Sequence, residues 1–106
     1  MDIRTESDAF GTVNIPIDKL WGTSTQRCLE NFPISTESMP APLITAYIQV
    51  KMAVARTNQA LGVLSDQKAE VIEKTCQLLL EEDYGDQFPL KIWQTGSGTQ
   101  TNMNVN

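Results

Sequence analysis

The stretch that most limits the fold is residues 40–62, PAPLITAYIQVKMAVARTNQALG. Pro42 suits the first turn of a helix, because proline lacks the N–H that this turn leaves unpaired. Gly62 is a natural helix end. Between them, apolar side chains recur at helical spacing, which predicts a long helix. The apolar stripe comprises Leu43, Tyr47, Val50, Val54 and Leu61, widened by Ile44, Ile48, Met52 and Ala55. A stripe this wide requires more than one neighbour to cover it.

A second helix is predicted over residues 66–83, with the hydroxyl of Ser65 as its N-terminal cap. Its last turn carries three acidic residues at 81–83. Negative charge there opposes the helix dipole, so we expect the helix to end early. The residues expected to face inward are Ala69, Ile72, Cys76 and Leu79.

The remaining elements are short. Alternation over residues 3–16, broken at Gly11, predicts a β-hairpin. We expect one helical turn at 17–22, a short helix or irregular turn over 23–32 and a short strand at 90–94. A final helix should start near residue 102, capped by Thr101 or Asn102. The fold class is therefore mainly α with a short N-terminal β-hairpin.

Composition excludes several functions. A chain of 106 residues forms at most one domain, and its net charge of −5 with scattered Lys and Arg argues against nucleic-acid or membrane-surface binding. No segment suits a membrane span, and residues 1–10 lack a secretory signal, so we expect a cytoplasmic protein. The sequence has no histidine. This excludes Ser-His and Cys-His nucleophile pairs and leaves too few ligands for a usual zinc site.

Residues 94–104, QTGSGTQTNMN, form a dense cluster of neutral hydrogen-bonding groups. Gly96 and Gly98 would let the backbone approach a ligand closely, and Ser97 and Thr99 would supply directed hydroxyl donors. A glycine-rich loop entering a helix is a sensible anion site. The alternative is an exposed polar loop without a ligand. A nucleotide site is disfavoured, because the third glycine and the P-loop lysine are lacking.

Two segments resemble one family. PLKIWQTGSGTQTNMNVN (89–106) closely resembles the first signature segment of class II fumarate hydratases in the fumarase/aspartase superfamily. RTESDAFGTVNIPIDKLWGTSTQRCLENFPI (4–34) resembles the opening segment of that family. Aspartase is a less favoured relative. The residues that distinguish the chain from aspartases are Gln94, Thr95, Ser97 and Gln100.

The resemblance implies a helical fold in which residues 1–106 form the N-terminal domain, without the central helical-bundle and C-terminal domains. It implies reversible hydration of fumarate to L-malate by a homotetramer without metal or organic cofactor. It assigns substrate-carboxylate binding to Ser97, Gly98 and Thr99. Supporting roles are left open for Thr95, Gln100 and Asn102. Family members occur in the cytoplasm and, as an alternative location here, in the mitochondrial matrix.

The resemblance places the family's other active-site segments, including its Thr-His pair and the loop bearing its base serine, outside these 106 residues. We therefore assign no catalytic residue and expect the chain alone to be inactive. We also expect an exposed apolar patch on the 42–61 helix, where the family's bundle would pack. The alternative is a short, non-catalytic fumarase-like chain that acts as a folding or interaction module.

Overall fold

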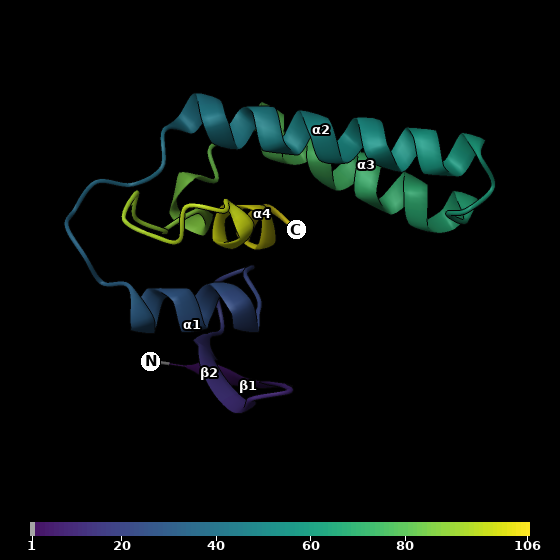
Figure 1. Cartoon of the computed structure of the whole chain (residues 1–106). Coiled ribbons are helices and arrows are strands. Elements are labelled where there is room, and N and C mark those ends of the chain that lie inside the picture. Colours follow the sequence, from purple (N-terminus) through teal and green to yellow (C-terminus); the bar gives the residue numbers. More distant parts are fainter. Residues whose placement is uncertain (1) are drawn as a thin grey trace. The chain divides into compact units, whose positions relative to one another are not determined.

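The structure, a computed structural model, describes residues 2–106 and divides into two compact units (Figure 1). Unit 1 combines the residues up to Met39 with Gly85–Asn106, and unit 2 is Pro40–Tyr84. Unit 1 contains β1 (Ile3–Asp8), β2 (Gly11–Pro16), α1 (Thr23–Asn31), a 3-10 turn (Gly85–Gln87) and α4 (Thr99–Val105). Unit 2 contains α2 (Ala41–Ala60) and α3 (Asp66–Glu81). The predicted class, mainly α with an N-terminal hairpin, is confirmed.

The hairpin of unit 1 forms as the alternating pattern predicts. β1 and β2 pair antiparallel, with Ile3 opposite Pro16, and Gly11 adopts a left-handed φ of +114° at the turn. Every second residue of a strand faces the same side. On β2 this rule buries Val13 and Ile15, which form the core of the unit together with Trp21.

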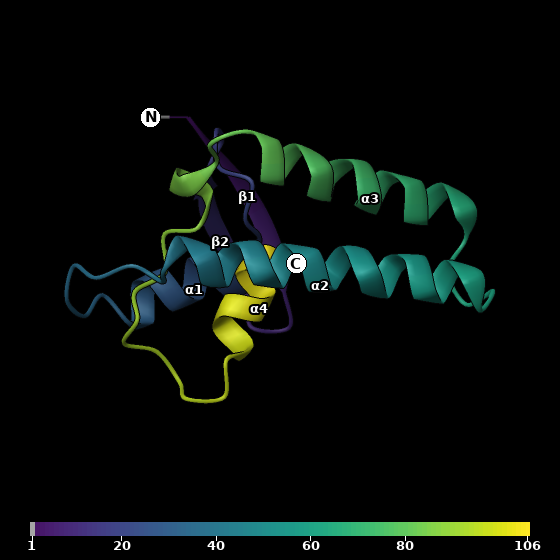
Figure 2. The same cartoon turned by 90° about the horizontal axis from the view of Figure 1, so that it is seen from above.

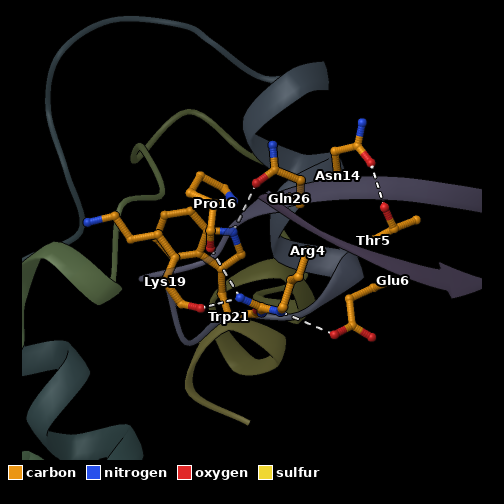
Figure 3. A network of polar contacts seen from close by, with 8 residues as sticks. All are labelled: Arg4, Thr5, Glu6, Asn14, Pro16, Lys19, Trp21 and Gln26. Atoms are coloured by element: carbon orange, nitrogen blue, oxygen red, sulfur yellow. Dashed lines mark hydrogen bonds and ion pairs between the residues drawn. The ribbon is translucent and has the colours of Figure 1, made fainter. Parts of the chain in front are cut away.

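Arg4 on β1 holds the connection from β2 to α1 (Figure 3). Its guanidinium donates to the carbonyl of Pro16 at 3.2 Å and to the carbonyls of Lys19 and Trp21 at 2.5 Å each. The backbone N–H of Leu20 donates to Gln87 Oε1 at 2.7 Å. The predicted helical turn at 17–22 is therefore wrong, because side chains from elsewhere bind the peptide groups that a helix would pair.

Arg27 on α1 binds the tip of the hairpin. Its guanidinium donates to both carboxylate oxygens of Asp8, at 2.9 and 2.8 Å, and to the carbonyl of Gly11 at 3.2 Å. The same guanidinium lies 5.8 Å from the centre of the exposed Phe10 ring. The backbone N–H of Phe10 also donates to Asp8. One carboxylate thus links the turn to the helix.

These contacts predict an acid-sensitive stability. The hydrogen bonds from Arg27, followed by that from the Phe10 N–H, lower the pKa of Asp8 from 3.8 to about 2. A carboxyl with a lowered folded-state pKa stabilises the fold above its unfolded pKa, and this contribution disappears as pH falls. Between about pH 4 and pH 2, the unfolding midpoint should fall more steeply for the unaltered chain than for Asp8→Asn, as followed by tryptophan fluorescence. Equal slopes would show that the Asp8–Arg27 contact does not stabilise the fold.

In unit 2, α2 and α3 lie side by side as a helical hairpin (Figure 2). α2 ends where predicted, since Gly62 takes a left-handed φ of +76°. The Ser65 hydroxyl accepts from the Lys68 N–H at 3.3 Å, which confirms the predicted cap. α3 ends at Glu81, before the two further acidic residues that the prediction included. Arg56 on α2 pairs with Glu73 on α3.

Only one side of α2 is covered. Ile44, Ile48 and Ala55 are buried. The other apolar side is exposed, at 39% for Leu43, 58% for Val50, 49% for Val54 and 71% for Leu61. The predicted exposed patch on this helix is therefore confirmed, and we call these four residues the α2 patch. On α3, Ala69 and Cys76 are buried as expected, but Ile72 is 37% exposed, because two helices cover only one face of each other.

Two further features concern membranes and thiols. Within residues 2–106, no helix has the length and apolar character needed to cross a membrane. Cys28 and Cys76 are free of disulfides and buried. Burial raises the pKa of both thiols.

Candidate functional site

The segment before the candidate loop is irregular. A single bridge links Lys91 to Ser38, and the Ile92 N–H donates to the carbonyl of Glu37 at 2.9 Å. The predicted strand at 90–94 is therefore wrong. Its partner segment stops at Pro40, because the next residue, Ala41, begins α2.

Gly98 marks the end of the loop and the start of α4. It has φ +82° and ψ 0°, a left-handed conformation that glycine adopts without steric penalty. Its carbonyl accepts from the Asn102 N–H at 3.0 Å, so α4 begins at Thr99. The predicted start near residue 102 is wrong by three residues. Thr101 and Asn102 lie inside the helix and do not cap it.

Three hydroxyls of the loop form a row. Thr95 Oγ1 lies 3.3 Å from Ser97 Oγ, which lies 3.2 Å from Thr99 Oγ1. All three residues are exposed. We call Thr95, Ser97 and Thr99 the hydroxyl row. The structure thus brings together the two hydroxyl residues that the sequence nominated, one on each side of Gly98.

Gln100 closes the Thr95 end of the hydroxyl row. Its Oε1 accepts from the backbone N–H of Thr95 at 2.7 Å and from the Thr95 hydroxyl at 3.1 Å. The sequence suggested Gln100 and Thr95 as supports without pairing them. Thr95 and Gln100 are only five positions apart in the sequence. An amide side chain can hydrogen-bond to many groups, however, so composition alone does not predict that these two residues pair.

Side chains on the inner face of α4 fix the loop to the rest of unit 1. The buried Thr101 donates to Gln94 Oε1 at 2.9 Å, and Gln94 Nε2 donates to the carbonyl of Lys91 at 2.7 Å. The buried Asn104 donates to the carbonyl of Gln87 at 3.0 Å. α4 also packs against α1 (Figure 1). Sequence reasoning missed Asn104 and the Thr101–Gln94 pair, because these polar residues look like exposed loop residues.

The chain resembles known hydratases over nearly its whole length. A family profile described as lyase matches residues 11–106. The class II fumarate hydratase of Myxococcus xanthus is 51% identical over 105 residues, which cover 99% of this chain and 22% of that protein. The class II fumarate hydratase of Bacillus cereus is 48% identical over 106 residues, which cover 100% of this chain and 23% of that protein. The chain spans about a fifth of the length of these relatives.

Solved structures give the same result. The recombinant class II fumarase from Schistosoma mansoni matches with a TM-score of 0.94 and 39% identity, over 98% of this chain and 22% of that one. A fumarate lyase:delta crystallin from Brucella melitensis matches with a TM-score of 0.92 and 33% identity, over 98% of this chain and 23% of that one. The chain therefore belongs to the lyase family that includes the class II fumarate hydratases, and it corresponds to the N-terminal region of their fold.

Proposed function

We propose that this chain supplies the N-terminal part of a fumarate hydratase, which interconverts fumarate and L-malate, and that Ser97, Gly98 and Thr99 bind a substrate carboxylate. The observation that carries the proposal is the pair of exposed hydroxyls flanking Gly98, in a chain 51% identical to a class II fumarate hydratase. These residues are the ones that the family resemblance selects for the carboxylate.

The chemistry of the loop supports this assignment. Ser97 and Thr99 place two neutral donors 3.2 Å apart, which suits the two oxygens of one carboxylate. Gly98 between them has no side chain to obstruct the ligand. Neutral donors bind an anion without a fixed counter-charge, which suits a substrate whose charge distribution changes during hydration.

The role proposed for this chain is binding, with acid and base chemistry supplied from outside it. The chain has no histidine, and residues 94–104 carry no ionisable side chain. We propose that the whole hydratase is a cytoplasmic homotetramer that uses no cofactor, with the mitochondrial matrix as the alternative location. The α2 patch is then the surface against which the rest of the enzyme packs.

The test uses an enzyme in which residues 1–106 are joined to the part of the Myxococcus xanthus hydratase that follows its matched region (the joined enzyme). The joined enzyme should hydrate fumarate. In it, Thr99→Ala and Ser97→Ala should each weaken substrate binding by about 1–3 kcal/mol, because each removes a hydrogen bond to a charged group. The measurement is KM for fumarate and kcat/KM, from initial rates.

The control is Thr12→Val, which removes an exposed hydroxyl on β2 and should leave KM unchanged. Unchanged kinetics in both loop variants would show that the carboxylate site lies elsewhere. A joined enzyme that does not fold, or that folds without hydrating fumarate, would contradict the proposed function. The folded but inactive outcome would favour the alternative, a non-catalytic module that docks through the exposed α2 patch.

A further inference from the structure

Unit 2 has a polar flank and an apolar flank. Arg56 on α2 pairs with Glu73 on α3, and this pair marks the polar flank. At about 100° per residue, the α2 patch lies about 140° around α2 from Arg56. On α3, Ile72 and the half-buried Leu79 lie on the other side of the buried Cys76 from Glu73. The α2 patch, Ile72 and Leu79 therefore share one flank, which we call the apolar flank.

One cation lies in the middle of the apolar flank. Lys51 is one helical turn from Val54 of the α2 patch and one turn from the buried Ile48, so it lies between the exposed and the buried rows of α2. Lys51 is itself half-buried. Among the described residues it has no acidic partner, whereas Arg56 on the same helix binds Glu73.

A second polar residue lies on the same row of α2, seven positions after Lys51. Asn58 is half-buried, and within residues 2–106 its side-chain amide makes no hydrogen bond. Water can solvate both side chains while the flank is uncovered. If an element covers the apolar flank, the Lys51 charge loses that water, which is costly unless a partner replaces it. The covering element must therefore supply a carboxylate opposite Lys51.

We propose that the apolar flank docks an amphipathic α-helix from the part of the hydratase outside these 106 residues, and that an acidic residue in the middle of this helix pairs with Lys51; this rests on the proposed function. The α2 patch residues are spaced seven, four and seven positions apart, a spacing that suits a helix packed nearly along α2. Most of the length of the hydratase relatives lies outside the matched region and can supply the helix. Lys51 then fixes the register of docking, because only one position of the helix pairs the charge.

The first test identifies the acidic residue by cross-linking in the joined enzyme. A carbodiimide links a lysine amine directly to a carboxylate, and mass spectrometry of the digest locates both residues. Lys51 should link to an Asp or Glu in a helix of the added part. The exposed Lys74 on α3 is the matched control and should link only within residues 1–106. A Lys51 link confined to residues 1–106 would overturn the inference, since the flank would then meet its own chain or a second copy.

The second test compares melting temperatures in two settings. In the joined enzyme, Lys51→Met should lower the melting temperature by about 2–4 °C, because it leaves the carboxylate covered and unpaired. In the 106-residue chain the same substitution should leave the melting temperature unchanged or raise it, because no partner is lost. Lys51→Arg keeps the charge and should restore the melting temperature of the joined enzyme without forming the cross-link. Lys74→Met should have the same effect in both settings.

A fall in melting temperature of equal size in both settings would overturn the inference, since the Lys51 stem would then act only within unit 2. These readouts do not depend on catalysis. If the cross-link forms in a folded joined enzyme that does not hydrate fumarate, the docking holds and the proposed function fails. If the joined enzyme hydrates fumarate but Lys51 does not link to the added part, the proposed function holds and the docking is refuted.

Discussion

The 106-residue chain alone should not hydrate fumarate at a measurable rate, whereas the joined enzyme should. The loop offers hydroxyls and amides, which bind an anion but do not exchange protons readily near pH 7. Positioned acids and bases each contribute about 10²- to 10⁴-fold to a rate. Lacking both, the chain should fall at least about 10⁴-fold below the joined enzyme, measured as loss of fumarate absorbance at equal protein concentration.

Two controls define this comparison. Circular dichroism of the chain should show its helices, so that lack of activity does not reflect lack of folding. The joined enzyme carrying Thr99→Ala shows how much activity depends on binding alone. Turnover by the pure chain that Thr99→Ala abolishes would refute the prediction, because it would place the acid and base chemistry within these 106 residues.

Substitution Arg4→Met should destabilise unit 1 by about 2–4 kcal/mol. The guanidinium donates to three backbone carbonyls around the core residue Trp21 (Figure 3), and its side chain is only 25% exposed. A hydrogen bond from a charged group contributes about 1.5–3 kcal/mol, and water can replace part of that loss. The measurement is urea unfolding followed by the fluorescence of Trp21 and Trp93, which both lie in unit 1.

Glu6→Gln is the matched control for Arg4. Glu6 pairs with the same guanidinium at 3.1 Å, but its side chain is 48% exposed. An exposed ion pair of this kind contributes about 0–1 kcal/mol, so the substitution should shift the unfolding midpoint little. If Arg4→Met costs no more than Glu6→Gln, the carbonyl contacts do not hold the connection to α1.

The parts of the fold that the sequence predicts depend on local patterns. The β-hairpin follows from alternation around Gly11, and α2 follows from helical spacing between Pro42 and Gly62. The Ser65 cap needs only residues within one turn. Each of these features is set by neighbours in the sequence, so reading a short window suffices.

The parts that were missed depend on distant partners. Residues 17–22 are shaped by Arg4 and by Gln87, which is 67 positions from Leu20. The segment at 90–94 lacks a strand because its partner stops at Pro40. For the site, composition indicated Ser97 and Thr99 as hydroxyl donors, but their contacts with each other, Thr95 and Gln100 depend on the folded path of the loop. A sequence contains no direct record of that path.

The order of the two units along the chain has a consequence for synthesis on the ribosome. Unit 2 is continuous, so its two helices can pair as soon as Tyr84 has emerged. Unit 1 begins first but needs Gln87 and α4, which are made after unit 2. The usual order, in which the N-terminal part of a protein folds first during translation, is therefore reversed here. Until residues 85–106 emerge, the β-hairpin and α1 can contact each other through Arg4 and Arg27 but lack their contacts with Gln87 and α4.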